Sequence, residues 1–382
     1  MQQGRRLTVI QLVPALETGG VERSTLEVGA ALVAAGHRSI VISAGGRLVP
    51  RLLAEGSEHI QRTIGAKSLL SLRHVAGLRS LFHEIKPDIV HARSRLPAWL
   101  AHFALKNGPP NTHFVTTAHG LNTPGRYSAI MTRGERVIAV SHTVRDYLIS
   151  HYEIDPERIV VIPRGIDLNE FPYGHRPDDE WLRAFYADYP RLRGAPLLTL
   201  PGRGTRIKGH ADAIELIAAL KQRGIATRLL LLGVVEPSRG NYVAELQRLA
   251  DERGVADDVV FAAPRADVRD VYAASALVLQ LSNKPEAFGR TVIEALALCR
   301  PVLGYAHGGV GELLTELYPS GRVPFDDFGR LVERAAELLR LAPAIPPLRR
   351  YQLADMQRAT LALYNALVNN DEASLRSTYA MS

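Results

Sequence analysis

The chain has 382 residues, of which 46% are hydrophobic and 22% are charged, and this composition excludes a wholly disordered protein. The length favours two domains of roughly 150 to 200 residues each. The single cysteine, Cys299, excludes a disulfide framework and a cysteine-based zinc site. We therefore expect a reducing compartment, the cytoplasm.

The formal net charge of +7 is unevenly distributed, because the stretch from Gly45 to Lys106 has ten Arg or Lys and only four Asp or Glu. Such a stretch favours anionic lipid headgroups, nucleic acid or acidic glycans as partners, and a solvated face without a partner explains it equally well. Aromatic residues make up 6% and form no aromatic-rich basic motif, which argues against single-stranded nucleic acid. We expect no nucleic-acid partner and salt-sensitive docking to an anionic membrane.

A membrane-spanning segment is not expected, since no stretch approaches about 18 consecutive apolar residues. The first residues, MQQGRRLTVIQLVPALETGG, superficially suggest a signal peptide. Their apolar run is short and is interrupted by Gln11, Pro14 and Glu17, so it predicts a buried first strand instead. The expected location is cytoplasmic, possible membrane contact being peripheral and at the inner membrane face.

Short apolar runs alternate with helical patterns along the first half of the chain. The predicted strands are Leu7–Val13, Ser39–Ala44, Asp88–Ala92, His113–His119, Arg136–Ser141 and Arg158–Pro163. Between them lie helical patterns such as Val21–Ala35, with Leu26, Ala30 and Val33 at helical spacing. The runs VIAV and IVVIP are apolar throughout, which is typical of parallel strands buried on both faces.

The alternation pauses over Asp167–Gly194, which predicts a domain boundary, and then restarts. The second set of predicted strands is Leu197–Leu200, Arg228–Leu232, Val259–Ala262, Leu277–Leu281 and Pro301–Tyr305. The second set of predicted helices is Ala211–Gln222, Tyr242–Glu252, Val268–Ala274, Arg290–Leu298 and Gly329–Leu341. Two such halves predict an α/β protein of two doubly wound domains. Ligands bind outside the carboxyl ends of such strands, so the expected site is the cleft between the domains.

In each half, a glycine-containing loop follows the first strand. Gly19 and Gly20 precede a helix, where backbone N–H groups can approach an anion, although simple turn chemistry explains them equally well. The loop Pro201–Gly209 matches neither a P-loop nor a dinucleotide motif. It does gather Arg203, Arg206 and Lys208 at a helix start, where they are either diphosphate ligands or solvated cations.

The segment Lys284–Leu296 is the most specific motif. Glu286 follows an apolar run, and Glu294 lies eight residues later, about two turns into a predicted helix. The backbone amides near Phe288 and Gly289 would lie at the N-terminus of that helix, which favours phosphate, while carboxylates accept hydrogen bonds from sugar and ribose hydroxyls. The alternative is a helix-dipole carboxylate at Glu286 and a surface residue at Glu294.

Other chemistries find little support in the sequence. The remaining histidines, including His91, His142, His151 and His307, have no metal-ligand spacing, so no metal is expected. Cys299 follows an apolar helix and is interpreted as a small buried hydrophobe. No G-x-S-x-G element appears, so a serine hydrolase of the α/β type lacks support.

In this order, Gly19-Gly20-Val21-Glu22, His119-Gly120, Pro163-Arg164-Gly165-Ile166-Asp167, Gly202-Arg203…Lys208-Gly209 and Glu286-x7-Glu294 resemble family 4 of the retaining glycosyltransferases. The resemblance covers nearly the whole chain, and the Glu-x7-Glu element is its most specific part. Segments such as 92–95 and 307–312 are closer to bacterial enzymes that build lipopolysaccharide core or other surface glycans.

The resemblance implies the GT-B architecture of two facing Rossmann-like domains. The N-terminal acceptor domain would comprise residues 1–168 plus a C-terminal crossing helix at about 362–382, and the donor domain residues 169–361. It further implies a metal-free enzyme that moves a sugar from a nucleotide-diphosphate sugar to a glycan or lipid-linked acceptor. The donor nucleotide sugar is a substrate, and no cofactor is required.

The resemblance also implies residue roles. Arg203 and Lys208 would hold the donor diphosphate, Glu286 the sugar hydroxyls and Glu294 the ribose. Gly19 and Gly20 would approach the phosphates or the acceptor, and His119 would lie near the donor sugar, although a structural histidine is the alternative. Pro264 and Arg265 would lie near the nucleobase. Two departures from the family pattern, Arg164 for Asn and Cys299 for Gly, are expected not to touch the donor contacts.

Three functions are weighed on this basis. The first is a retaining glycosyltransferase, in which the leaving phosphate activates the acceptor on the same face, since no residue is identified as a carboxylate nucleophile. The second is a related GT-B phosphorylase or epimerase. The third is a non-catalytic basic protein that binds membranes or nucleic acid. A final helix predicted at Leu348–Val368 would cross back to the first domain, and closure of the cleft over the donor would follow.

Overall fold

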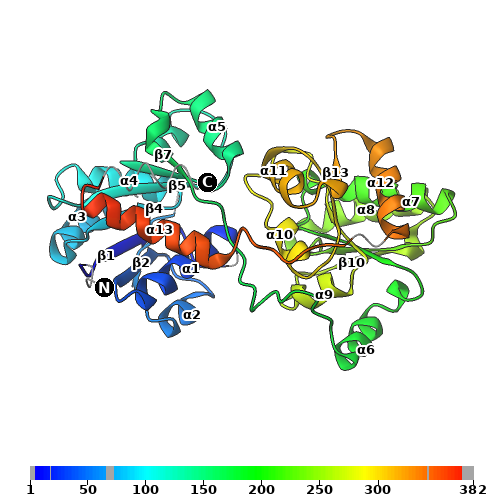
Figure 1. The fold of residues 1–382 in the computed structure, drawn as a ribbon. Helices are drawn as coiled ribbons and strands as arrows, with labels where there is room; N and C mark the ends of the chain where they lie inside the picture. The colour runs from blue at the N-terminus through cyan, green and yellow to red at the C-terminus, as the bar shows by residue number, and fades with distance from the viewer. Residues whose placement is uncertain (1–4, 18, 66–72, 342–343, 372–382) are drawn as a thin grey trace. The chain divides into compact units, whose positions relative to one another are not determined.

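The structure is a computed structural model that describes residues 5–17, 19–65, 73–341 and 344–371. It divides into two compact units (Figure 1). The first unit comprises residues 1–165 and 353–382, and the second comprises residues 166–352. The last eleven residues of the expected crossing segment, 372–382, lie outside the described residues.

The first unit is built on a parallel sheet in the order β3-β2-β1-β4-β5-β6-β7. Its strands are β1 Thr8–Leu12, β2 Arg38–Ser43, β3 Glu58–Gln61, β4 Ile89–Ala92, β5 His113–Ala118, β6 Arg136–Ala139 and β7 Ile159–Val161. From β1 the chain first builds outward to β3 and then continues on the other side with β4. The strand order therefore reverses between β1 and β4, where open α/β sheets bind ligands beyond the strand ends.

Helices cover both faces of this sheet (Figure 1). They are α1 Gly20–Ala34, α2 Val49–Ala54, α3 Arg73–Ile85, α4 Arg95–Leu105, α5 His142–His151 and α13 Leu353–Val368. The last of these, α13, packs Leu363 and Tyr364 into the same apolar cluster as Val9 and Val28. Next to it lies α1, whose Glu27 carbonyl accepts a hydrogen bond from Gln357 Nε2 at 2.8 Å (Figure 1). The C-terminal helix is thus an integral part of the first unit.

The second unit has a parallel sheet in the order β10-β9-β8-β11-β12-β13. Its strands are β8 Leu197–Pro201, β9 Arg228–Leu232, β10 Val259–Ala262, β11 Leu277–Gln280, β12 Val302–Tyr305 and β13 Arg322–Val323. Its helices are α6 Asp179–Asp188, α7 His210–Gln222, α8 Gly240–Glu252, α9 Val268–Ala274, α10 Arg290–Ala297, α11 Gly308–Leu317 and α12 Phe328–Arg340. The strand order reverses between β8 and β11, so the loops after these two strands meet at one edge.

The structure confirms the α/β fold class and every strand predicted from an apolar run. It adds two edge strands that the sequence pattern did not predict, β3 and β13. Both pair with a neighbour on one side only, so they need no continuous apolar run: β3 is half exposed and β13 has two residues. The stretch that carried no strand signal includes a helix, α6.

The predicted start of the last helix was wrong. It begins at Leu353, and the preceding residues belong to the second unit. Tyr351 has a left-handed backbone with φ 61°, and its carbonyl accepts the Ile166 amide at 2.9 Å. Because this pairing draws the chain into an extended bridge between Ile166 and Gln352, Arg349 and Arg350 precede the helix rather than lie on it.

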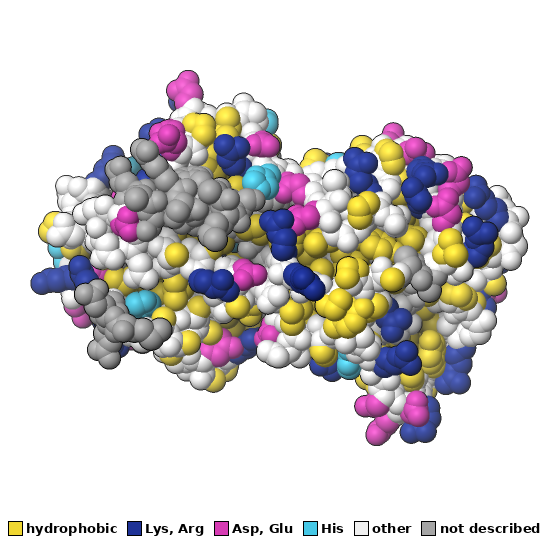
Figure 2. Space-filling view, viewed as in Figure 1, with side chains coloured by type: hydrophobic (Ala, Val, Ile, Leu, Met, Phe, Trp, Pro, Cys, Tyr) yellow, Lys and Arg dark blue, Asp and Glu magenta, His cyan; other side chains and the backbone are white. Residues whose placement is uncertain are grey.

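Several cations of the basic stretch bond to other groups of the first unit. Arg93 is 3% exposed and bonds to buried polar groups, Arg51 pairs with Glu55 at 2.7 Å, and Arg79 donates to carbonyls of α4. Lys67 lies outside the described residues. On the face drawn in Figure 2, basic and acidic side chains are interspersed on each unit. Among the described residues, no helix combines the length and apolar character needed to cross a bilayer.

Candidate functional site

The loops after β8 and β11 bring together Lys208 and Glu286. Lys208 Nζ lies 2.6 Å from Glu286 Oε1, and their side chains are 24% and 23% exposed. The two strands are neighbours in the sheet, so residues 78 apart in the chain meet at one edge. A partly shielded ion pair at the carboxyl ends of parallel strands is the geometry expected of a polar ligand site.

Gly209 fixes the Lys208 loop. Its φ of 74° is left-handed, and a Cβ atom there would lie 1.9 Å from the Leu281 carbonyl oxygen. The same two loops are also joined through Asn283, whose amide donates to the Ile207 carbonyl and whose side chain donates to the Arg206 carbonyl, each at 3.0 Å. Only glycine permits this approach, and the approach sets the distance from Lys208 to Glu286.

Glu286 is held at both its side chain and its backbone. Ser282 Oγ donates to Glu286 Oε1, the oxygen that also receives Lys208. The Glu286 carbonyl accepts the Gly309 amide at 2.7 Å, in a bridge to the first turn of α11. His307 Nε2 bonds to the Ser282 carbonyl at 2.8 Å and its ring stacks on Phe325. Ser282 and His307 therefore keep the carboxylate in place.

The N-terminus of α10 lies three residues beyond Glu286. Gly289 is its N-cap with φ 106°, and a Cβ atom there would lie 2.8 Å from Val310 Cγ2. Phe288 is buried and packs near the Tyr351 ring. Glu294 is 7% exposed and accepts from Arg290 Nε at 3.2 Å, which is not the surface position that the alternative interpretation assumed. Backbone N–H groups at the N-terminus of a helix can bind an anion.

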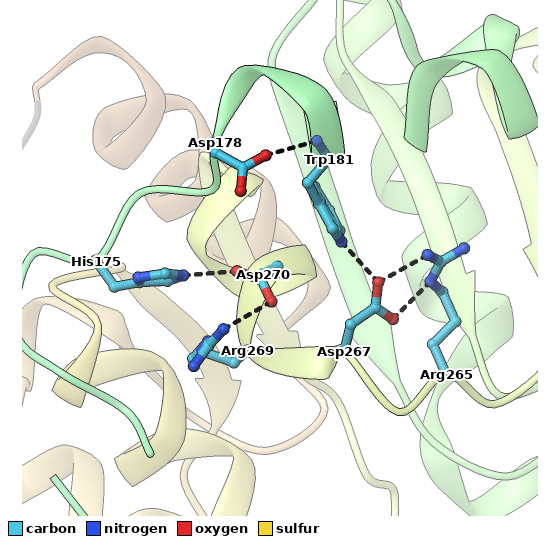
Figure 3. Close-up of polar contacts among 7 residues, drawn as sticks. All are labelled: His175, Asp178, Trp181, Arg265, Asp267, Arg269 and Asp270. Atoms are coloured by element: carbon cyan, nitrogen blue, oxygen red, sulfur yellow. Dashed lines mark hydrogen bonds and ion pairs between the residues drawn. The ribbon is translucent and has the colours of Figure 1, made fainter. Parts of the chain in front are cut away.

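The remaining predicted cations of this unit have different surroundings. Arg203 is exposed, whereas Arg206 is paired with Glu245 of α8. Arg265 forms two bonds to Asp267, at 2.8 and 2.7 Å, and Asp267 also accepts from Trp181 Nε1 at 2.7 Å (Figure 3). The hydrogen bonds to Asp267 raise the pKa of Arg265 above its ordinary value. Its guanidinium is therefore occupied by Asp267, and the structure does not bring it to Lys208.

In the first unit, Arg164 connects two of the predicted site elements. Its guanidinium donates to His119 Nδ1 at 2.8 Å and to the Gly20 carbonyl in the first turn of α1. The expectation that Arg164 avoids the donor contacts was therefore wrong, since it touches two residues assigned to them. Gly19 is the N-cap of that helix, and Glu22 folds back over it.

His119 is a neutral imidazole in this environment. Burial, followed by the nearby positive charges of Arg164 and Arg93, holds its pKa well below the ordinary value of 6.5. A guanidinium only donates hydrogen bonds, so Nδ1 accepts and the proton lies on Nε2. His119 in this state has no basic nitrogen left to receive a proton from a substrate.

A cavity of about 300 Å³ opens beside His119 within the first unit. Its polar lining includes Glu22, Arg93, Ser94, Arg95, Thr117 and Asn122. Arg95 also bonds to Ser128 Oγ at 3.2 Å, and its guanidinium lies over the Tyr127 ring. This cavity has the size and mixed lining of a site for a small polar molecule.

A buried polar network lies behind the cavity. Arg93 donates to Gln11 Oε1 at 2.7 Å and to Ser24 Oγ at 2.9 Å. His91 bonds to Tyr364 Oη of α13 and to Thr117 Oγ1, each at 2.6 Å. Burial, followed by the charge of Arg93, keeps the pKa of His91 well below its usual value. Through this network α13 helps to set the position of the cavity wall.

The sequence alone indicated neither the contribution of Ser282 nor the contacts of Arg164. Arg164 was identified there only as a departure from a family pattern. Cys299, interpreted as buried, is partly exposed and has a left-handed φ of 61°, a conformation that suits the glycine common at this position in the family. Within the described residues, no three His, Cys, Asp or Glu side chains cluster as metal ligands.

Comparisons with known proteins match both halves of the chain. The family model described as Glycosyltransferase Family 4 matches residues 18–170, and that described as Glycosyl transferases group 1 matches residues 188–350. A D-inositol 3-phosphate glycosyltransferase of Actinosynnema mirum is 32% identical over 187 residues, which cover 47% of this chain. The match spans only 43% of that relative's own length.

Solved structures resemble the whole chain. A glycosyltransferase from Rickettsia africae ESF-5 has a TM-score of 0.85 and 28% identity, over 96% of this chain and 100% of that one. Anabaena Alr3699/HepE in complex with UDP-glucose has a TM-score of 0.73 and 19% identity, over 97% and 99%. WaaG, a glycosyltransferase involved in lipopolysaccharide biosynthesis, has a TM-score of 0.65 and 19% identity, over 96% and 98%. With two matching family models that together span most of its length, and with two parallel α/β units, the chain belongs to glycosyltransferase family 4 and has the GT-B fold.

Proposed function

We propose that the protein transfers a sugar from a nucleoside-diphosphate sugar to an acceptor hydroxyl with retention of the anomeric configuration. The observation that carries this proposal is the Lys208–Glu286 pair at the β8 and β11 strand ends, three residues before the α10 N-terminus. A cation, a carboxylate and a helix N-terminus together match the phosphates and hydroxyls of such a donor.

In this proposal Lys208 and the exposed Arg203 bind the diphosphate. Positive charge develops at the anomeric carbon while the leaving diphosphate gains negative charge, and a preorganised cation stabilises that charge. The amides of Phe288 and Gly289 bind phosphate at the helix end, and Glu286 accepts hydrogen bonds from the sugar hydroxyls. Glu294 binds the ribose, and since Asp267 engages the Arg265 side chain, we propose that the backbone near Pro264 and Arg265 contacts the base.

The first unit binds the acceptor, and its polar cavity beside His119 supports this assignment. His119 contributes its backbone near the reacting sugar, and the Gly19–Gly20 turn approaches the phosphates or the acceptor. Because His119 is not a base, the acceptor proton passes to the leaving phosphate on the same face of the sugar. Trapping a covalent glycosyl-enzyme intermediate would contradict this step.

The proposed acceptor is a lipopolysaccharide core or another surface glycan, reached from the inner membrane face. Relatives named D-inositol 3-phosphate glycosyltransferases act on a phosphorylated polyol, and Arg93 and Arg95 in the cavity lining suit an acceptor with an anionic group. Assays that offer lipopolysaccharide core fragments and D-inositol 3-phosphate side by side distinguish the two acceptors.

The test is a mass-spectrometric screen for consumption of nucleotide sugars with and without these acceptors. We expect one nucleotide sugar to be consumed, and Lys208→Ala and Glu286→Ala each to reduce the rate about 10²- to 10³-fold. Glu245→Ala, at the neighbouring exposed pair, is the control and should retain the rate. NMR of the product's anomeric proton tests retention. Unchanged activity in both site variants would disprove the assigned roles.

A further inference from the structure

In the free protein the two charges of the donor site neutralise each other. Lys208 Nζ and Glu286 Oε1 are 2.6 Å apart, and three quarters of each side chain is shielded from solvent. In the function proposed above, the diphosphate binds the ammonium and the sugar hydroxyls bind the carboxylate. A donor therefore competes with an internal partner for each of these groups.

The two partners differ in their freedom to move. The Glu286 carboxylate also accepts a hydrogen bond from Oγ of Ser282, a residue that is 5% exposed, and the Glu286 carbonyl accepts the Gly309 amide. Lys208 has a flexible four-carbon stem, which lies against Gly202. When a phosphate approaches, the ammonium can turn toward it, whereas the carboxylate stays where Ser282 and α11 hold it.

We propose that Glu286 discriminates a sugar-loaded donor from a spent nucleoside diphosphate by competing for Lys208, an inference that rests on the function proposed above. When the sugar is present, its hydroxyls donate to Glu286 and replace the ammonium. When it is absent, the carboxylate keeps only Ser282 and lies beside an anionic phosphate. The pair thus weakens binding of the product diphosphate relative to the donor and favours its release.

The test is isothermal titration of UDP and UDP-glucose, with ADP and ADP-glucose and GDP and GDP-mannose as further pairs. For the nucleoside diphosphate and its sugar derivative that wild type binds, Glu286→Ala should tighten binding of the diphosphate about threefold to tenfold. This is the range expected for removing one partly shielded like charge. The same variant should weaken the nucleotide sugar. Glu286→Gln should also tighten the diphosphate, since its amide is neutral.

Two controls make the test specific to this pair. Glu245→Ala removes the same charge from α8, where Glu245 pairs with Arg206, two residues before Lys208. It should leave the diphosphate-to-sugar affinity ratio unchanged. In a Lys208→Met background, Glu286→Ala should tighten the diphosphate less than it does in wild type, because the ammonium for which both compete is gone and only the repulsion between carboxylate and phosphate remains.

The outcomes separate this inference from the proposed function. If wild type binds a nucleoside diphosphate and Glu286→Ala leaves that affinity unchanged or weaker, the competition is disproved while the proposed function stands. If Glu245→Ala tightens the nucleoside diphosphate as much as Glu286→Ala does, the effect comes from long-range charge, and the competition is also disproved. Failure of wild type to bind any of the six probes would overturn the proposed function and this inference with it.

Discussion

Acid should destabilise the first unit through two histidines, the buried His91 and the half-buried His119. His91 and His119 have folded pKa values well below 6.5, chiefly because burial disfavours the imidazolium. At pH 7.5 both are neutral in the folded and the unfolded chain, so they contribute no pH dependence. As the pH falls below about 6.5, the unfolded chain binds protons that the folded unit does not bind, and the free energy of unfolding decreases.

The magnitude follows from this linkage. A histidine that stays neutral when folded and has an ordinary pKa when unfolded costs about 1.4 kcal/mol between pH 7.5 and pH 5.5. His91 is fully buried, and both its nitrogens are bonded, to Tyr364 Oη and Thr117 Oγ1. His119 is partly exposed, so its contribution is at most as large. Together they predict a loss of about 2 to 3 kcal/mol.

Urea unfolding of the full chain at pH 7.5, 6.5 and 5.5 measures this loss, and a variant assigns it. His91→Gln should reduce the number of protons taken up on unfolding by about one, although it lowers stability at every pH. Stability that is flat between pH 7.5 and 5.5, or a wild-type slope in His91→Gln, would refute the reasoning.

Three further predictions concern the site and the basic stretch. Gly209→Ala should lower the free energy of unfolding of the second unit by about 3 kcal/mol or more and abolish nucleotide binding, because the left-handed φ is strained for alanine and the new Cβ meets the Leu281 carbonyl. Gly224 has the same φ of 74°, but a Cβ there would have nothing within 4 Å. Gly224→Ala should therefore show only the strain, about 1 kcal/mol, in urea unfolding. Arg164→Met should raise the pKa of His119 and loosen its tautomer, which ¹⁵N NMR of the imidazole reports; an unchanged spectrum would contradict the assigned bond. Flotation with anionic vesicles should show weak binding that is lost at high salt, and binding that ignores salt would contradict docking through the basic stretch.

The sequence was sufficient for the central strands because apolar runs such as VIAV report burial on both faces of a parallel sheet. It was insufficient for the edges, where β3 and β13 pair on one side and need no such run. The final helix shows the same limit. The sequence pattern predicted a start at Leu348, but the bond from Ile166 to the Tyr351 carbonyl, a contact between residues 185 apart, delays the start of the helix to Leu353.

The candidate site divides in the same way. Motif spacing identified Lys208 and Glu286, whose roles depend on which residue ends which strand, and neighbouring strands bring such residues together. Ser282 and Arg164 depend on side-chain direction, which spacing does not encode. Arg164 was visible only as a departure, and the structure gives that departure a physical reason: a guanidinium reaches both His119 Nδ1 and the Gly20 carbonyl. An asparagine has a far shorter side chain and carries no charge, so substituting it here would free the His119 imidazole from both the hydrogen bond and the positive charge of Arg164. Arg164→Asn should therefore behave like Arg164→Met in the imidazole spectrum, and a wild-type spectrum in Arg164→Asn would show that the length of the arginine is not what matters at this position.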